Sequence, residues 1–228
     1  MELKPIAFLH TDFPTKFGIP RQSGLAPSLR AEIVFEPEYR DANALRGLDG
    51  FSHLWLIWGF SGVPQRDGFS PMVKPPRLGG NTRMGVFATR SPFRPNPIGL
   101  SSVKLEAIEP RPQKGLVLIV SGADLMDGTP IYDVKPYLPF TDSHPDAKGG
   151  FSEERLSYAL AVDAPEELLS VLPAEKRAAL IEALRQDPRP AYRTDPDERH
   201  GFFYAGFDVR FTVSDGTAHV CEIVPMEQ

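Results

Sequence analysis

The sequence predicts a mainly β protein with an N-terminal β-barrel and a small α+β domain after it. Short apolar segments separated by glycine and proline turns recur through the first 140 residues, and only one short helix is expected among them. This pattern favours a closed or nearly closed barrel over a sheet that alternates with helices. The pattern changes after Tyr137, where a polar linker precedes two helical segments and a hairpin. We therefore expect domains at 1–145 and 150–228.

The strands expected in the first domain are short and rich in branched or aromatic residues. One of them alternates clearly, since Val103, Leu105 and Ala107 are separated by Lys104 and Glu106, as in a half-buried strand. A short helix is expected at 39–48. The predicted strands are 3–9, 29–35, 53–60, 84–89, 102–108, 115–122 and 130–137.

The second domain is expected to contain both helices and strands. Residues 138–154 read as a linker, and LSYALAV after it alternates as a strand does. Residues 164–186 predict two helices, because Pro165 and Pro173 each suit a first helical turn and glutamates follow both. The C-terminal segments FFYAGFDVRFTV and AHVCEIV predict a hairpin that turns at SDGT.

Composition narrows the class of protein. No apolar run reaches the roughly 20 residues that span a bilayer, and the N-terminus lacks the apolar region of a secretory signal, so we expect a cytoplasmic protein. The single cysteine, Cys221, excludes an intrachain disulfide framework. The five histidines show no metal-ligand spacing, and we predict no structural metal.

Charge is unevenly distributed along the chain. The net charge is −5, yet the segment 66–104 contains seven basic residues and one acidic residue. A local basic face is compatible with a phosphate-bearing ligand even on an acidic protein. The alternative is a solvated basic face without a ligand.

The segment RSPFRPNPIGLS, 90–101, combines three prolines with two arginines. Proline fixes its own φ angle and restricts the residue before it, so the segment is expected to be a stiff loop, not a helix or a central strand. Such a loop would hold Arg90, Arg94 and Asn96 in fixed directions. The alternative is a structural corner whose arginines face water.

Several enzyme classes lack their motifs in this sequence. It has no phosphate-binding loop that ends in Lys and Ser or Thr, and no G-x-G-x-x-G after a strand. It also has no G-x-S-x-G, no H-E-x-x-H and no cysteine paired with a histidine in a known motif. Nucleotide triphosphatases, Rossmann enzymes and the common hydrolases are therefore disfavoured.

Two further segments carry polar groups suited to a ligand. PRQSG, 20–24, sets Arg21 and Gln22 between a proline and a glycine. DLMDGTPIYDVKPY, 124–137, places Asp127 in an Asp-Gly turn and Lys135 on the following strand. Asp127 could equally be only a turn former, and Lys135 a strand-edge charge.

Together these segments resemble the TsaA-like family of tRNA methyltransferases. The resemblance rests on PRQSGL, RGLDGFSHLW, PPRLGGNTRMGVFATRSPFRPNPIGLS, DLMDGTPIYDVKPYLPF and DPRPAYR, and it spans about residues 5–140 with a second patch at 187–193. It implies a β-barrel enzyme that binds S-adenosylmethionine. It further implies methylation of N6 of N6-threonylcarbamoyladenosine, beside the anticodon of threonine-accepting tRNA. It also implies a homodimer.

The resemblance assigns roles to individual residues. The family's cofactor-binding segments match residues 20–22, residues 124–127 and both ends of the proline-rich loop. Residues 61–70 match a loop that varies within the family, so no cofactor contact can be transferred to them. The cofactor-binding residues implied are Pro20, Arg21, Gln22, Arg90, Leu100, Asp124, Leu125, Met126 and Asp127.

A mechanism follows as a hypothesis. N6 in a urea-like linkage is a weak nucleophile, so its methylation needs a base or cations near the developing charge. Arg90, Asp127 and Lys135 are the candidate catalytic residues, with Asp127 either a base or a cofactor anchor. Candidate tRNA contacts are Arg94, Asn96, Arg189 and Tyr192, although Asn96 could instead serve the loop backbone and Tyr192 could pack between domains.

Two other functions remain open at this point. The chain could be a non-catalytic RNA-binding barrel in which the basic segment only follows a nucleic-acid backbone. It could also be a methyltransferase for another modified base or a small molecule. Binding of S-adenosylmethionine separates the first alternative from the enzyme, and the identity of the methylated product separates the second.

Overall fold

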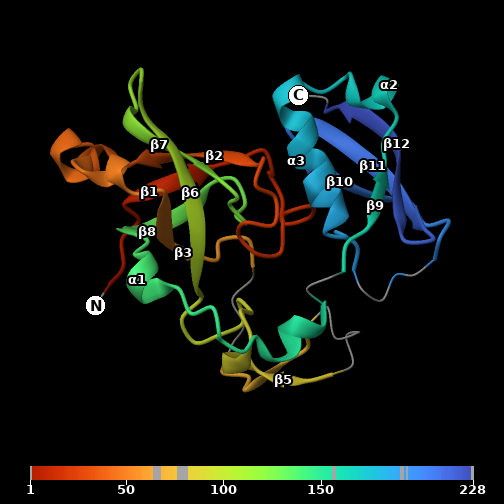
Figure 1. The fold of residues 1–228 in the computed structure, drawn as a ribbon, viewed down its shortest axis with the longest axis horizontal. Helices are drawn as coiled ribbons and strands as arrows, with labels where there is room; N and C mark the ends of the chain where they lie inside the picture. Colours follow the sequence, from red (N-terminus) through yellow and green to blue (C-terminus); the bar gives the residue numbers. More distant parts are fainter. Residues whose placement is uncertain are drawn as a thin grey trace.

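The computed structural model describes residues 2–63, 68–75, 82–155, 158–190, 193 and 195–226. Six strands of the N-terminal part form one closed sheet, and four strands of the C-terminal part form a second sheet. Figure 1 shows the two sheets side by side, with α3 (Ala174–Arg185) packed on the second. The mainly β architecture with an α+β C-terminal part is therefore confirmed.

The first sheet closes into a ring because its first and last strands pair. The strand order is β1-β2-β7-β6-β3-β8, all neighbours are antiparallel, and β1 pairs with β8. Leu54, Leu56 and Trp58 alternate along β3 and point into the core of the ring. The strands are β1 (Ala7–His10), β2 (Arg30–Phe35), β3 (His53–Gly59), β6 (Ile98–Arg111), β7 (Gly115–Ser121) and β8 (Thr129–Pro136).

Three expectations for the first domain were wrong in part. The predicted helix at 39–48 is a series of separate 3-10 turns, because the backbone is extended at Asp41 (ψ 121°) and at Arg46 (ψ 123°). The strand predicted at 84–89 ends as β5 (Met84–Gly85), which pairs with β4 (Met72–Val73), and a 3-10 turn follows. The last four residues of the proline-rich segment already belong to β6. The 3-10 turns are Pro37–Tyr39, Ala42–Leu45, Leu48–Gly50 and Val86–Ala88.

The second sheet has the order β10-β11-β12-β9, with β9 parallel to β12. The predicted hairpin is confirmed, since Asp215 and Gly216 both have positive φ angles at the turn between β11 and β12. The strand predicted at LSYALAV is shorter than expected, and residues 156 and 157 lie outside the described residues. The strands are β9 (Ala161–Asp163), β10 (His200–Tyr204), β11 (Phe207–Ser214) and β12 (Thr217–Pro225).

The first of the two helices predicted in the C-terminal part is shorter than the sequence predicts. Of the two helices expected at 164–186, α2 (Glu166–Leu169) is a single turn and only α3 is long. The expected linker contains α1 (Pro139–Asp142) and a 3-10 turn at Gly150–Arg155. Within the described part of the chain, no helix is both long enough and apolar enough to cross a membrane.

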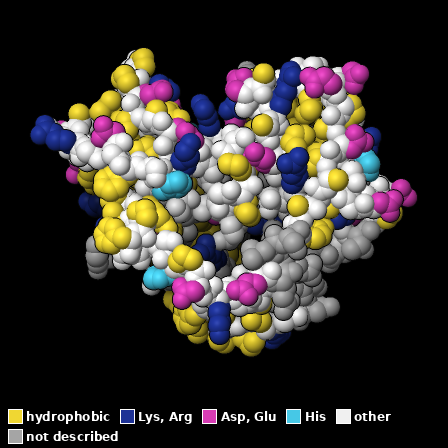
Figure 2. Space-filling model, in the orientation of Figure 1, with side chains coloured by type: hydrophobic (Ala, Val, Ile, Leu, Met, Phe, Trp, Pro, Cys, Tyr) yellow, Lys and Arg dark blue, Asp and Glu magenta, His cyan; other side chains and the backbone are white. Residues whose placement is uncertain are grey.

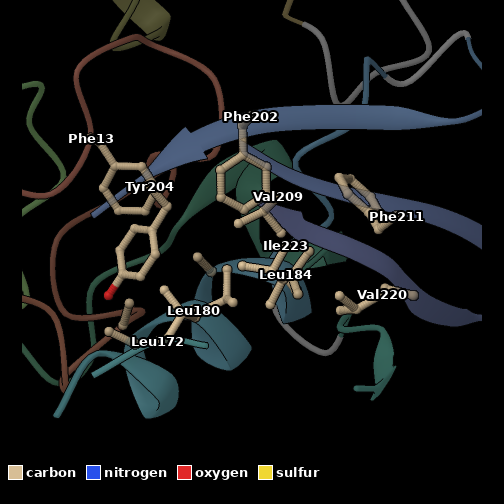
Figure 3. Close-up of a cluster of buried hydrophobic side chains, with 14 of the residues drawn as sticks. Phe13, Leu172, Leu180, Leu184, Phe202, Tyr204, Val209, Phe211, Val220 and Ile223 are labelled. Atoms are coloured by element: carbon tan, nitrogen blue, oxygen red, sulfur yellow. The ribbon is translucent and has the colours of Figure 1, made fainter. Parts of the chain in front are cut away.

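The core of the C-terminal part includes residues from the N-terminal part. Phe13, Ala26 and Leu29, all from the segment between β1 and β2, are buried with side chains of α3 and the second sheet. Figure 3 shows Phe13 beside Tyr204, and their ring centroids are 5.0 Å apart. The segment 11–29 therefore joins the two parts through apolar packing as well as through the backbone.

Candidate functional site

Three loops leave the barrel at the same rim. They join β1 to β2 (11–29), β3 to β6 (60–97) and β7 to β8 (122–128). Because neighbouring strands are antiparallel, the ends that these loops connect all lie at one end of the barrel. The rim therefore gathers the sequence segments 20–22, 90–96 and 124–127, which are far apart along the chain.

The first rim loop is held by helix α3. The backbone N–H and the hydroxyl of Ser28 donate to the two carboxylate oxygens of Glu182, each at 2.8 Å. Lys176 forms an ion pair with Asp12 at 2.7 Å, and the N–H of Ala205 donates to the carbonyl of Asp12. The C-terminal part therefore fixes both ends of this loop.

Arg21 links the same loop to the segment after α3. Its guanidinium donates to the backbone carbonyls of Asp187, at 2.6 Å, and Arg189, at 3.3 Å. Arg189 in turn binds the carboxylate of Asp187 through two nitrogens, and the hydroxyl of Tyr158 donates to the same carboxylate at 2.6 Å. Burial alone would raise the pKa of Asp187, but these hydrogen bonds outweigh it and the pKa lies below its usual value.

Gln22 and Arg90 meet across two rim loops. The Arg90 guanidinium donates to the side-chain oxygen of Gln22 at 2.5 Å, and the Gln22 amide donates to the carbonyl of Arg21 at 2.6 Å. Both side chains are polar and lie at the surface. Their contact places one guanidinium and one amide beside each other, a pair suited to bind a carboxylate or an adenosine edge.

Asp124 is the buried carboxylate of the rim. It accepts a hydrogen bond from Ser101 at 2.6 Å, and the indole of Trp58 donates to Ser101 at 3.0 Å. Burial raises the pKa of Asp124, against the opposing effects of the Ser101 hydrogen bond and the charge of Arg90. Glycine is required at position 99, beside these hydrogen bonds, because a Cβ there would lie 2.2 Å from the Trp58 ring. Asp124 is therefore a pre-positioned acceptor with little solvent around it.

Asp127 is the exposed carboxylate of the rim. Its Oδ1 accepts from the backbone N–H of Thr11 at 3.1 Å and lies 3.2 Å from Nδ1 of His10. Its own backbone N–H donates to the carbonyl of Phe13. Among the described residues Oδ2 has no hydrogen-bond partner, and the side chain is 44% exposed. One oxygen thus anchors the loop, and the other is available to a ligand.

An open groove extends from the rim to the C-terminal sheet. The groove has a volume of about 760 Å³. It runs from Met126 and Gly62, past residues 14–17, to residues 199–203, which include most of β10 and the residue before it. The Met126 side chain lies against Gly62. Figure 2 shows Lys and Arg side chains on the face between the barrel and the C-terminal part.

Family models match the chain in two parts. The model of the tRNA-methyltransferase O N-terminal domain matches residues 8–143, and the model of the TrmO C-terminal domain matches residues 157–226. The chain belongs to the tRNA-methyltransferase O family. Its relatives and structural neighbours agree with this assignment over nearly the whole length.

The relatives carry related names. A tRNA (adenine(37)-N6)-methyltransferase of Escherichia coli K12 is 42% identical over 98% of both chains. A putative S-adenosylmethionine-dependent methyltransferase of Pseudomonas aeruginosa is 40% identical over 92% of this chain and 91% of the relative. A crystal structure of TrmO from Pseudomonas aeruginosa has a TM-score of 0.77 with 32% identity and covers 98% of each chain.

Lys135, a candidate catalytic residue of the mechanistic hypothesis, and Leu100, a cofactor contact implied by the resemblance, both face the outer wall of the barrel. Lys135 lies six residues into β8, about 20 Å along the strand from the rim end. It forms an ion pair with Asp133 at 2.8 Å, and this hydrogen bond raises the pKa of Lys135. Leu100 is 52% exposed. It lines a hollow on the outer barrel wall together with Lys135 and Trp55. Arg90, Asp127 and Lys135 are therefore not brought together within one chain.

The other predicted residues have different environments. Leu125 is buried in the barrel core, so only its backbone can face a ligand. Arg94 donates to the carbonyl of Thr89 at 3.1 Å and so supports its own loop, and its contact with tRNA stays a prediction. Asn96 is exposed, and its carbonyl accepts from the N–H of Ile98. Tyr192 lies outside the described residues, and its role stays a prediction.

Several residues of the site were not found from the sequence. His10 and Ser101 contact Asp127 and Asp124, yet each is an ordinary polar residue at a strand position. Glu182 reads as one more exposed charge on a helix until Ser28 is seen beside it. Their partners are 23 to 154 residues away, so no local pattern could have indicated them. Within the described ranges, no group of His, Cys, Asp and Glu side chains could hold a metal ion.

Proposed function

We propose that this chain transfers the methyl group of S-adenosylmethionine to N6 of adenine 37 in tRNA. The observation that carries the proposal is the similarity to a tRNA (adenine(37)-N6)-methyltransferase along 98% of both chains. The name of the Pseudomonas aeruginosa relative supports S-adenosylmethionine as the cofactor. A non-catalytic barrel accounts less well for a rim with two carboxylates and a paired guanidinium.

The rim residues fit this cofactor. Its carboxylate suits the guanidinium of Arg90 and the amide of Gln22, which already lie together. Its amino group and ribose hydroxyls suit the carboxylates of Asp124 and Asp127, and Met126 provides an apolar surface. When bound, S-adenosylmethionine supplies an electrophilic methyl group on a positively charged sulfur.

The residues of the chain would act on the acceptor by position and by proton transfer. Methylation of N6 requires that the donor carbon and N6 lie about 3 to 3.5 Å apart, which rigid loops favour. N6 loses its proton when it is methylated. The Oδ2 of Asp127 can accept an N–H from N6 or from the amino group of the cofactor, and Thr11 and His10 hold the carboxylate in place through Oδ1.

We propose that the specific substrate is N6-threonylcarbamoyladenosine in threonine-accepting tRNA. Its threonyl carboxylate would require a cation, and Arg90 at the rim is the candidate within one chain. Lys135 becomes a second candidate only if another copy of the chain brings its outer wall to the rim. The outer wall near Lys135 presents apolar surface, which supports a homodimer through this wall. The apolar residues are Leu100, Trp55 and Phe140.

The C-terminal domain, 150–228, has two proposed roles. It supports the first rim loop through Glu182 and Lys176. It contributes to tRNA recognition through the segment around Arg189, whose own side chain is only 13% exposed and is bound by Asp187. A cytoplasmic location, where tRNA is modified, stays a prediction.

The test combines cofactor binding with product analysis. Calorimetric titration with S-adenosylmethionine should show micromolar binding that is weakened in Arg90→Ala and unchanged in Arg46→Ala, an exposed arginine on the far side of the barrel. Methyl transfer to threonine tRNA should require threonylcarbamoyladenosine at position 37. Folded protein that binds no S-adenosylmethionine, with or without tRNA, would favour the non-catalytic barrel. Methylation of other adenines would contradict the proposed substrate.

A further inference from the structure

The groove between the rim and the C-terminal sheet contains side chains that the proposed reaction does not use. Met126 belongs to the cofactor rim, but Lys16, Phe17, Arg199 and Phe203 lie beyond it along the groove. Its volume of about 760 Å³ is in the range of ligand sites. The groove therefore leads away from the reaction centre along a surface that carries basic and aromatic side chains.

The uncompensated charge in this groove is positive. Neither Lys16 nor Arg199 forms an ion pair with any described residue, and both are exposed. Asp208, the acidic residue that lines the groove, pairs with Arg210 at 2.9 Å, and Arg210 also pairs with Glu222. On a chain with a net charge of −5, this local excess of positive charge favours an anionic ligand.

The same groove exposes two phenylalanine rings. Phe17 is 53% exposed and Phe203 is 37% exposed, whereas the nearby rings of Phe13 and Tyr204 are buried in the core. The backbone explains why Phe17 points outward. Gly18, at φ 86°, lies so close to the Phe202 ring that a Cβ would be 2.4 Å from it, and the chain turns there. Lys16 and Phe17 are thereby presented at the tip of this turn, with the Lys16 ammonium 5.7 Å from the Phe17 ring centre.

Aromatic rings beside cations are the combination that binds single-stranded nucleic acid, because bases stack on the rings while phosphates contact the cations. An acidic peptide would use the cations but would leave the rings unmatched. The bases next to adenine 37 lie in the single-stranded anticodon loop, and the groove begins at Met126 on the cofactor rim.

We propose that this groove binds the unpaired nucleotides of the tRNA anticodon loop that flank adenine 37. Phe17 and Phe203 stack on bases, and Lys16 and Arg199 contact the phosphates between them. The groove thereby leads the loop toward the methyl donor. This inference rests on the proposed function, and it adds the surface by which the loop is held.

The experiment measures binding of a threonine-tRNA anticodon stem-loop that carries threonylcarbamoyladenosine, by fluorescence anisotropy over a series of salt concentrations. Phe17→Ala and Phe203→Ala should each weaken binding by about 5- to 150-fold at every salt concentration, the equivalent of one lost base stack. Lys16→Ala and Arg199→Ala should each reduce the slope of log K against log salt by about 0.7. Affinity for S-adenosylmethionine should not change.

Matched controls come from exposed residues elsewhere on the chain. Val171→Ala removes part of an apolar side chain that is 44% exposed after α2, and Lys4→Ala removes an exposed charge near the N-terminus. Neither should alter stem-loop affinity or the salt slope. Thermal melting checks that each variant is folded. If Phe203→Ala is unfolded, the charge reversal Lys16→Glu at a fully exposed turn replaces it and should weaken binding further than Lys16→Ala.

Two results would overturn the groove assignment while the proposed function stands. One is wild-type enzyme that methylates tRNA while the groove variants bind the stem-loop with wild-type affinity and slope. The other is groove variants that lose S-adenosylmethionine affinity, which would make the groove part of the cofactor site. Failure of the proposed function has a different signature, because the wild-type protein itself would then neither bind S-adenosylmethionine nor methylate tRNA.

Discussion

The contact between Ser28 and Glu182 should stabilise the protein and its first rim loop. Glu182→Ala removes two hydrogen bonds of 2.8 Å to a carboxylate that is only partly exposed. Hydrogen bonds to charged groups contribute about 1.5 to 3 kcal/mol each when buried, and partial exposure reduces this, so we expect a loss of about 2 kcal/mol for the pair. For a chain of this size the melting temperature should fall by roughly 4 to 8 °C.

The assay is urea denaturation followed by circular dichroism, arranged as a double-mutant cycle. Ser28→Ala removes the hydroxyl but keeps the backbone N–H, so the cycle with Glu182→Ala isolates the side-chain hydrogen bond, with an expected coupling of about 1 kcal/mol. Glu175→Ala on the same helix is the control for a general loss of charge. Because the loop carries Gln22, Glu182→Ala should also weaken S-adenosylmethionine binding. A stability loss no larger than that of Glu175→Ala, with no coupling to Ser28, would refute the reasoning.

Two pH predictions follow from the buried carboxylates. Burial raises the pKa of Asp124, so the folded state loses stability as pH rises through that pKa, and Asp124→Asn should gain in stability relative to wild type between about pH 3 and pH 7. Denaturation at a series of pH values checks this, and a constant difference between the two proteins would contradict it. The pKa of Asp187 is lowered, so its stabilisation is present at neutral pH and is lost as pH falls below about 4. Asp187→Asn keeps a residue that tolerates the observed φ of 50° and should cost about 1 to 3 kcal/mol at pH 7, and the cost should shrink as pH falls below about 4. A cost that persists unchanged at pH 3 would assign the effect to packing instead of charge.

Local patterns were sufficient for most strands but not for the turns between them. The alternation of Val103, Leu105 and Ala107 predicted β6 because one face of a strand must meet the core. The prediction of a helix at 39–48 was wrong, since the backbone is extended at Asp41 and at Arg46, and only packing shows where the chain bends. The length of α2, which is a single turn, was overestimated because helical propensity is a weak guide to the length of a helix.

The candidate site divides in the same way. Arg90 and Asp127 could be named from short motifs, since proline, glycine and aspartate mark rigid loops near a ligand, and Asp124 was implied by the family resemblance. Two of their neighbours could not be named, because Ser101 and His10 lie on strands distant in sequence from Asp124 and Asp127. Lys135 differs from these residues. The mechanistic hypothesis grouped it with Arg90 and Asp127, whereas strand geometry places it on the outer wall, so its catalytic role stays a prediction that needs a second copy of the chain.

The sequence by itself determined the mainly β class, the rigid proline-rich loop and the family, because these depend on residue types at short spacings. Only the tertiary structure decided that three distant loops meet at one rim and that α3 holds the first of them. It also showed that Phe13 belongs to the C-terminal core and that a groove leads from Met126 to β10. The physical reason is that these features depend on strand order and on contacts between residues more than 100 positions apart, and periodicity along the chain carries no information about either.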